Sequence, residues 1–154
     1  MNSRRQRPLN LLVDLTRDQT NEAGRQLSQL VTERNGAAQQ LDTLRHYRED
    51  YVERLNQGGQ TGMTASNYRN FTRFLDTLDD AILQQNKLMD QLDQNISVYK
   101  DAWRQSQRQL HSYETLQTRQ HKQYLQAEAR REQLVTDEIS TLVYHRRRSD
   151  RGQT

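Results

Sequence analysis

The amino-acid sequence predicts an all-α protein, a long two-helix antiparallel coiled-coil hairpin whose second helix overhangs the first. Three observations predict this fold class: the composition, two heptad-spaced apolar stripes, and one glycine-rich segment between them. Only 32% of the 154 residues are hydrophobic, 28% are charged, and there is a single Pro. Such a composition cannot fill a thick core, but it suits long helices that each bury one narrow stripe.

The first helix is expected over residues 9–56. From Leu9 to Leu55 the stripe residues recur in alternating steps of three and four, which places them along one side of a helix. Arg34 and Arg48 interrupt the stripe, and we expect their stems to lie across the seam between the helices while the guanidinium groups reach solvent. The stripe consists of Leu9, Val13, Thr16, Thr20, Ala23, Leu27, Leu30, Arg34, Ala37, Leu41, Leu44, Arg48, Tyr51 and Leu55.

A turn or flexible loop is expected at residues 57–65, where three of the six glycines gather. The second helix is expected over residues 66–146, and a frayed basic tail over residues 147–154. Gly36, inside the first helix, is expected to be a tolerated weak point, because an interior Gly costs about 1 kcal/mol relative to Ala. The second stripe consists of Tyr68, Phe71, Leu75, Leu78, Ile82, Gln85, Met89, Leu92, Ile96, Tyr99, Trp103, Ser106, Leu110 and Tyr113.

The expected pairing of the helices is antiparallel, because a short connection already brings their ends together. A register that sets Tyr51 against Phe71 and Thr20 against Trp103 places small residues of one stripe opposite large residues of the other. In this register the second helix has no intramolecular partner beyond Tyr113. That segment still carries spaced apolar residues, so it is a candidate for binding a partner protein.

The residue types do not indicate an enzyme. There is no cysteine, and the four histidines are dispersed, without the HExxH spacing of a zinc site. The glycine-rich segment lacks the Lys-Ser/Thr that completes a phosphate-binding loop. We therefore expect no catalytic residue, no metal and no cofactor, and a single non-enzymatic coiled-coil domain over residues 1–154.

Charge and hydropathy argue against two kinds of partner, nucleic acid and the interior of a membrane. The chain has 23 basic and 20 acidic residues, a net charge of +3, which does not favour a dedicated nucleic-acid binder. No apolar run approaches the roughly 20 residues of a membrane span, and the N-terminal residues do not form a signal peptide. We expect a cytoplasmic protein without a nucleic-acid partner.

The order and spacing of several segments resemble the FliJ family of the flagellar type III export apparatus. These segments are Tyr47-x3-Tyr51, the glycine-containing loop, Tyr68 to Ile82, Trp103-Arg104, and Glu114 to Arg119. The resemblance extends over roughly residues 9–138. It implies a stalk and adaptor that promotes assembly of the export ATPase hexamer and binds the cytoplasmic domain of the membrane export gate and export chaperones. The protein would be peripheral, reaching the cytoplasmic face of the inner membrane through these partners only.

The resemblance also implies where partners bind. The family's export-gate patch corresponds to Gln40, Leu44, Tyr47, Tyr51, Phe74, Leu78, Ala81 and Gln85. Contact with the ATPase ring is expected at Leu116, Tyr124, Arg130, Arg131, Leu134, Ile139 and Leu142. Tyr47 and Phe74 lie beside the expected seam, where aromatic side chains act as interface anchors or widen the seam. Other members of the patch belong to the seam itself and can support it without touching the gate.

Two alternatives remain open at this point. One is the equivalent stalk protein of a virulence injectisome, which the physical properties of the sequence do not separate from a flagellar protein. The other is a self-associating structural coiled coil that dimerises through the segment beyond Tyr113. Sedimentation distinguishes the latter, since an adaptor should be mainly monomeric without its partners.

Overall fold

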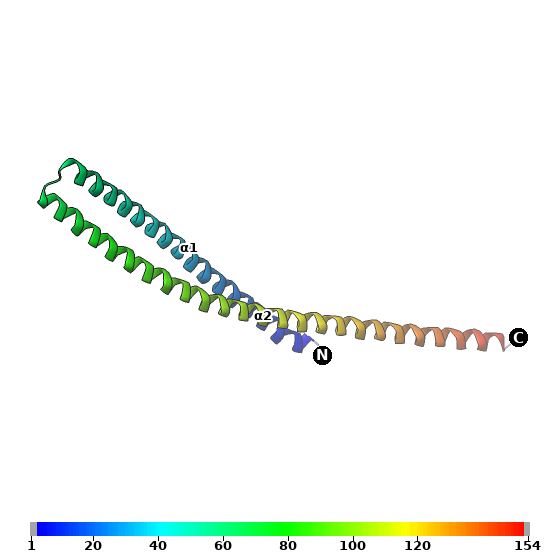
Figure 1. The fold of residues 1–154 in the computed structure, drawn as a ribbon. Helices are drawn as coiled ribbons and strands as arrows, with labels where there is room; N and C mark the ends of the chain where they lie inside the picture. The colour runs from blue at the N-terminus through cyan, green and yellow to red at the C-terminus, as the bar shows by residue number, and fades with distance from the viewer. Residues whose placement is uncertain (1–2, 153–154) are drawn as a thin grey trace. The chain divides into compact units, whose positions relative to one another are not determined.

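A computed structural model describes residues 3–152, and it contains two long helices joined by a tight turn (Figure 1). Helix α1 spans Ser3–Thr61 and helix α2 spans Ala65–Arg151. No strand occurs among the described residues. The prediction of an all-α hairpin of two long helices is confirmed.

The turn between the helices is shorter than the loop expected at residues 57–65. Helix α1 continues through Gly58 and Gly59, and Gly62 alone among the described residues has a positive φ, of 88°. The backbone N–H of Met63 donates to the carbonyl of Gly58 at 3.0 Å and so closes the end of the helix. The predicted loop bounds were wrong because glycines can stay helical, and only the left-handed position strictly favours one.

Helix α2 is capped at its start by Thr64, whose Oγ1 accepts a hydrogen bond from the backbone N–H of Asn67 at 3.3 Å. At the other end, the tail expected to fray from residue 147 is helical as far as Arg151. Ser149 Oγ donates to the carbonyl of His145 at 3.0 Å, and basic residues in the last turn complement the helix dipole. Residues 153–154 of that tail lie outside the described residues.

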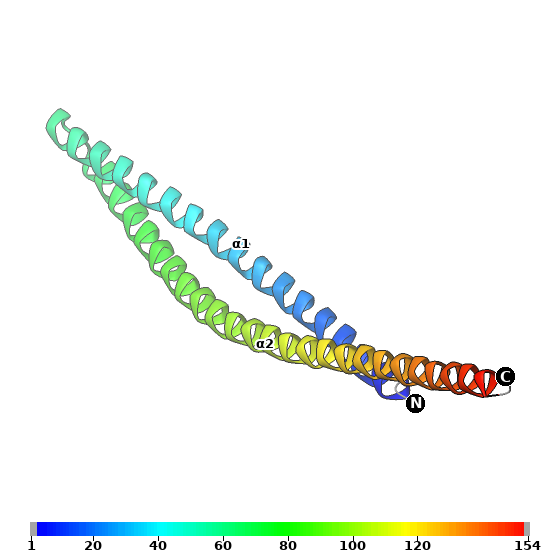
Figure 2. The ribbon, with the colours of Figure 1, turned by 90° about the vertical axis from the view of Figure 1, so that its right-hand side faces the viewer.

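The chain divides into two compact units. We call Gln19–Ser106 the hairpin unit, and Met1–Asp18 together with Gln107–Thr154 the terminal unit. Within the hairpin unit, α1 and α2 lie side by side and antiparallel in both views (Figures 1 and 2). The single domain expected for residues 1–154 stays a prediction.

The seam of the hairpin unit follows the predicted stripes. Ala37, Leu41, Leu78 and Leu92 are its buried apolar residues, and each is 6–7% exposed. The rings of Tyr51 and Phe71 lie 5.6 Å apart between centroids, as the expected register requires.

Two stripe residues were placed wrongly in the seam. Tyr68 is 53% exposed and Tyr99 is 40% exposed. Each lies three residues from a better-buried stripe residue, Phe71 or Ile96. A three-residue step falls about 60° short of a full helical turn, so it carries the side chain to the flank of the stripe.

The stripe arginines reach across to acidic residues that the sequence pattern did not indicate. Arg34 Nε donates to Asp93 Oδ1 at 3.1 Å, and Arg48 Nε donates to Asp79 Oδ1. All four side chains remain at least one-third exposed to solvent. The arginines therefore lie across the seam as expected, and they also tie α1 to α2 by exposed ion pairs.

Trp103 packs against Gly24, one helical turn from Thr20, the residue with which it was expected to pair. A Cβ atom on Gly24 would lie 3.2 Å from Trp103 Nε1, closer than ordinary van der Waals contact. The largest side chain of α2 thus lies against the smallest residue of α1. The direct pairing of Thr20 with Trp103 stays a prediction.

In the terminal unit, α1 pairs with α2 farther than expected. Gln117 Nε2 donates to Asn10 Oδ1 at 2.6 Å, and Gln120 is still half-buried. The limit expected at Tyr113 was wrong because polar side chains such as Asn10 and Gln117 continue the pairing, and because α1 begins at Ser3 instead of residue 9. Residues 121–151, which we call the C-terminal segment, are all exposed.

Candidate partner-binding surfaces

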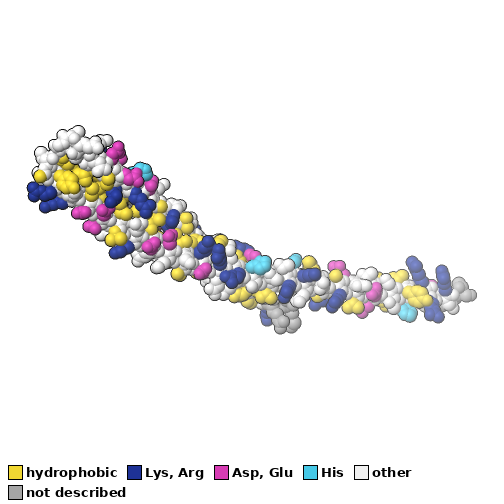
Figure 3. Space-filling model, viewed as in Figure 1, with side chains coloured by type: hydrophobic (Ala, Val, Ile, Leu, Met, Phe, Trp, Pro, Cys, Tyr) yellow, Lys and Arg dark blue, Asp and Glu magenta, His cyan; other side chains and the backbone are white. Residues whose placement is uncertain are grey.

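The hairpin unit carries an aromatic cluster close to the α1–α2 turn, where hydrophobic side chains gather (Figure 3). The Tyr51 and Phe74 ring centroids lie 4.4 Å apart, and Phe71 lies on the same tyrosine at 5.6 Å. The guanidinium carbon of Arg54 lies 5.7 Å from the Tyr51 centroid, within cation–π distance. Tyr51 is thus held among three neighbours, which fixes the position of the more exposed Phe74.

The eight residues expected at the export-gate patch all lie in the hairpin unit and differ in exposure. Leu78 is buried, at 6% exposure, so it supports the surface from below. The half-buried members are Leu44, Tyr51, Ala81 and Gln85. The exposed members are Gln40, Tyr47 and Phe74. A partner that docks here would touch the exposed members first, and Tyr47, at 55% exposure, offers the most accessible aromatic ring.

Gln85 connects the two helices beneath this surface. Its Nε2 donates to the backbone carbonyl of Ala37 at 2.9 Å and to Oε1 of Gln40 at 3.2 Å. The carbonyl oxygen of Ala37 already accepts one hydrogen bond within its own helix, so it accepts the bond from Gln85 with its second lone pair. Gln85 therefore positions Gln40 and fixes the register in the middle of the expected patch.

A hollow of about 550 Å³ continues the patch along α1. It is lined by Gly36, Gln39, Gln40, Thr43 and Leu44. A Cβ added to Gly36 would meet nothing within 4 Å, so the hollow lies open above that residue. Sequence reasoning treated Gly36 only as a weak point of the helix and missed the hollow.

The residues expected to contact the ATPase ring lie in the terminal unit, and all of them are exposed. Leu134, Ile139 and Leu142 are 66%, 56% and 67% exposed. The Tyr124 hydroxyl donates to Glu128 Oε1 at 2.7 Å, and this hydrogen bond to a carboxylate raises the pKa of the tyrosine. The remaining members are Leu116, Arg130 and Arg131. Leu116 lies in the part of α2 that is paired with α1, and the others lie in the C-terminal segment.

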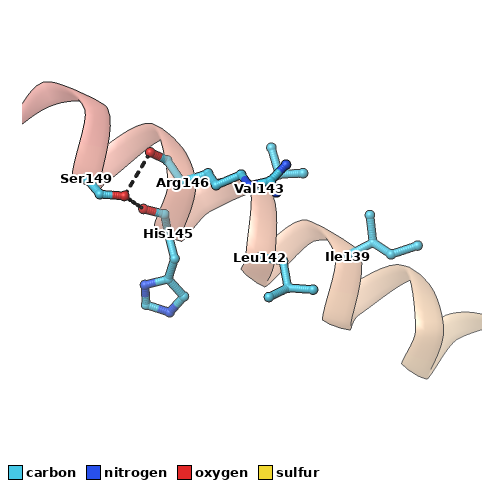
Figure 4. Close-up of a pocket in the computed structure, with 6 residues that line it drawn as sticks. All are labelled: Ile139, Leu142, Val143, His145, Arg146 and Ser149. Carbon is cyan, nitrogen blue, oxygen red and sulfur yellow. Dashed lines mark hydrogen bonds between the residues drawn. The ribbon is translucent and has the colours of Figure 1, made fainter.

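The end of the C-terminal segment carries a second hollow, of about 480 Å³ (Figure 4). Its lining residues are Ile139, Leu142, Val143, His145, Arg146 and Ser149. The Arg146 side chain runs back along the helix toward Val143, so its stem adds apolar surface beside a positive charge (Figure 4). Sequence reasoning identified Ile139 and Leu142 here but did not place Val143 and Arg146 beside them.

Among residues 3–152, no group of three or more His, Cys, Asp or Glu side chains is placed to hold a metal ion. Neither helix, in its described part, is long and apolar enough to cross a bilayer. The exposed His46 donates its Nδ1–H to the carbonyl of Asp42 at 2.8 Å, and this contact, with the Asp42 carboxylate, raises the pKa of the imidazole.

Comparison with known proteins adds the family. A family model described as "Flagellar FliJ protein" matches residues 5–149. The chain belongs to the FliJ family. It is 31% identical over 129 residues to the flagellar FliJ protein of Escherichia coli strain K12, covering 84% of this chain and 88% of that relative. It is 30% identical over 132 residues to the flagellar FliJ protein of Salmonella typhi, covering 86% and 90%. The predicted resemblance to this family is confirmed. The aromatic cluster and most of the C-terminal segment lie within the matched residues 5–149.

Proposed function

We propose that this FliJ-family chain is a non-enzymatic central stalk and adaptor of the flagellar type III protein export apparatus. In this role it promotes assembly of the export ATPase ring and connects the ring to the export gate and to export chaperones. The observation that carries the proposal is the presence of two separate exposed apolar surfaces on one helical chain. One is the aromatic cluster of the hairpin unit, and the other is the C-terminal segment.

The C-terminal segment is the surface that we assign to the ATPase ring. A lone polar helix is marginal in water, so residues 121–151 gain stability from docking. Ile139 and Leu142 supply apolar contact area, and Arg131 and Arg146 lie at the same three-four spacing. A ring lining that combines apolar pockets with carboxylates fits this chemistry.

The aromatic cluster is the surface that we assign to the export gate. Exposed aromatic side chains that are fixed by neighbours lose little conformational entropy on binding and serve as anchors of interfaces. Phe74 has this character, because it is 41% exposed and held by Tyr51, and Tyr47 adds a ring that is 55% exposed. Export chaperones are the third proposed partner, and attachment to the cytoplasmic face of the inner membrane would occur through the gate.

The two alternatives, an injectisome stalk protein and a self-associating coiled coil, are supported to different degrees. Both named relatives are flagellar proteins, which favours the flagellar apparatus over an injectisome. Self-association through the C-terminal segment is supported by the exposed Val135, Ile139 and Leu142. Arg146 opposes self-association, because it continues the row formed by Val135, Ile139 and Leu142. In a parallel dimer Arg146 would face Arg146 of the second copy, and like charges repel.

Variants of the full chain test the assignment of the two surfaces. Ile139→Asp combined with Leu142→Asp should weaken binding to the purified export ATPase about tenfold or more, because it places charges in an apolar contact. Both residues are more than half exposed, so the melting temperature and the affinity for the gate's cytoplasmic domain should remain unchanged. Unchanged ATPase binding would overturn the assignment of this segment. Sedimentation of the wild-type chain as a stable dimer would favour the self-associating alternative.

A further inference from the structure

Six residues of the C-terminal segment form one continuous row along α2. They recur in alternating steps of four and three, the spacing that keeps side chains on one side of a helix in a two-helix seam. All six are exposed to solvent, so α1 does not cover them. We call them the exposed row, and they are Glu128, Glu132, Val135, Ile139, Leu142 and Arg146.

The exposed row is acidic at one end, apolar in the middle and basic at the other end. Its three apolar residues are 55–67% exposed. The Tyr124 hydroxyl donates to Oε1 of Glu128, which leaves Oε2 of this carboxylate available. Within residues 3–152, neither Glu132 nor Arg146 takes part in an ion pair. The row therefore offers charges of both signs to a partner.

The steps of the exposed row are the same in both directions along the helix, which are four, three, four, three and four residues. A second copy laid antiparallel therefore presents the same row in a matching register. In this register Val135 faces Ile139 of the second copy, and Glu128 faces Arg146 of the second copy. Each contact occurs twice, because a two-fold axis relates the copies. Apolar residues then meet in the centre and opposite charges meet at both ends.

Arg146 is placed to reach both acidic residues of the second copy. Its side chain runs back along the helix toward Val143, so the guanidinium lies nearer the centre of the row than its own Cα (Figure 4). In the antiparallel register this position falls between Glu128 and Glu132 of the second copy. A guanidinium carries five N–H donors, so it can hydrogen-bond to two carboxylates. Glu132, which faces Leu142 across the seam, thereby gains a cationic partner.

The length of the C-terminal segment also fits a second copy. Helix α2 is fully exposed from residue 121 onward. In the antiparallel register Arg151, the last residue of α2, faces Gln123 of the second copy. The second copy thus covers the segment almost from end to end, and it stops before the part of α2 that is already paired with α1.

Other occupants match the charges less well. An anionic lipid surface would attract Arg146 but repel Glu128 and Glu132, which lie in the same row. A parallel second copy would set each of these charges against its own counterpart. Only the antiparallel copy places a charge of opposite sign at both ends of the row.

The size of this interface makes the pairing weak and reversible. Residues 123–151 span about 43 Å at 1.5 Å per residue, and a helix is about 10 Å wide. Each copy then buries roughly 400 Å², about half of the area that each partner buries in a standard stable interface. Such a dimer forms at high protein concentration and yields to a larger interface.

We propose that, in the absence of the ATPase ring, the C-terminal segments of two chains pair antiparallel through the exposed row. Each chain thereby covers the surface assigned to the ring, so dimer formation and ring binding exclude each other. This competition rests on the proposed function, whereas the dimer itself does not.

Sedimentation equilibrium of the full chain tests the dimer. The chain should be mainly monomeric at about 5 µM and mainly dimeric at about 500 µM. Arg146→Glu sets like charges against each other at both ends of the row, so it should weaken dimerisation about tenfold. Adding Glu128→Arg to this variant exchanges the charges and should restore most of the affinity. Such rescue requires that Glu128 and Arg146 face each other.

Arg148→Glu is the matched control for Arg146→Glu. It makes the same change of charge, but Arg148 lies about 200° around the helix from Arg146 and so outside the exposed row. This variant should dimerise like the wild type. Equal weakening by the two substitutions would show an effect of net charge alone and would overturn the inference.

The orientation of the two copies is measured separately. The chain has no cysteine, so His145→Cys carries a single spin label. Antiparallel pairing sets the two labelled backbone positions about 25 Å apart, whereas parallel pairing sets them about 10 Å apart. The shorter distance would overturn the inference.

Addition of the purified export ATPase separates this inference from the proposed function. The ATPase should convert the dimer into a complex that contains the chain without its second copy. A wild-type chain that stays monomeric at every concentration overturns the inference and leaves the proposed function intact. A dimer that persists on the ATPase overturns the claim that the two states exclude each other. An ATPase that does not bind the chain overturns the proposed function, while the charge rescue and the label distance still decide the dimer.

Discussion

The ring of Tyr51 on α1 contacts the ring of Phe74 on α2, with 4.4 Å between centroids and 33° between planes. This contact joins the interior of the seam to the exposed surface, because Tyr51 is half-buried while Phe74 is 41% exposed. A residue that stabilises the fold therefore also orients a residue that is available to a partner. Folding and binding effects can be separated by substituting the residues one at a time.

Tyr47→Ala and Phe74→Ala should weaken binding to the gate domain about tenfold each, and each should lower the free energy of unfolding by less than about 1 kcal/mol. The reason is their exposure, 55% and 41%, which leaves little apolar area to lose on unfolding. Tyr51→Ala serves as the contrast and should reduce both affinity and stability. Calorimetric titration alongside thermal melting provides the comparison. Equal losses of affinity and stability in the first two variants would mean that these rings only widen the seam.

Gly24→Ala should destabilise the protein by about 1 kcal/mol, because overfilling this packed site costs about 2 kcal/mol and the helical preference of Ala returns about 1 kcal/mol. The added methyl would lie 3.2 Å from Trp103 Nε1, and the rigid indole has to shift to accept it. Gly36→Ala has open space around it and should stabilise by about 1 kcal/mol. Urea denaturation followed by circular dichroism measures both. The same sign of change for the two variants would contradict the packing of Trp103 on Gly24.

His46 should titrate with a pKa above its ordinary value of 6.5, because the Asp42 carbonyl and carboxylate favour the protonated ring. A raised pKa in the folded state means that this small stabilisation is fully present below about pH 6.5 and is lost as the pH rises through the folded pKa. NMR titration of the imidazole protons gives the value directly. In Asp42→Asn the pKa should fall, since the carboxylate is removed while the backbone contact remains. A wild-type value at or below 6.5 would argue against the contact.

Much of the fold is predictable from the spacing of apolar residues. The stripes indicated both helices, and the matching of small with large residues indicated a register that the Tyr51–Phe71 contact confirms. The turn was harder to predict, because three glycines gather near it and only Gly62 adopts the left-handed conformation. The limits of the helices were also misjudged, since terminal turns are stabilised by local hydrogen bonds such as that of Ser149, which apolar spacing does not reveal.

The candidate surfaces were predictable in part. The exposed positions of Tyr47 and Phe74 follow from their place beside the stripes. The hydrogen bonds from Gln85 to Ala37 and Gln40 depend on which flanks of the two helices adjoin, so they become visible only when the register is known. The acidic partners of Arg34 and Arg48 could not be predicted for the same reason, because each of them lies on the opposite helix.

ATP hydrolysis by the purified export ATPase provides the most direct test of the proposal that this chain is a stalk with two separate partner surfaces. The full chain would be compared with a chain that ends at Gln120, which keeps the part of α2 that pairs with α1 and removes the C-terminal segment. The shortened chain should bind the gate domain with unchanged affinity and fail to stimulate hydrolysis, whereas the full chain does both. Full stimulation by the shortened chain would contradict the role of the C-terminal segment and with it the proposed stalk.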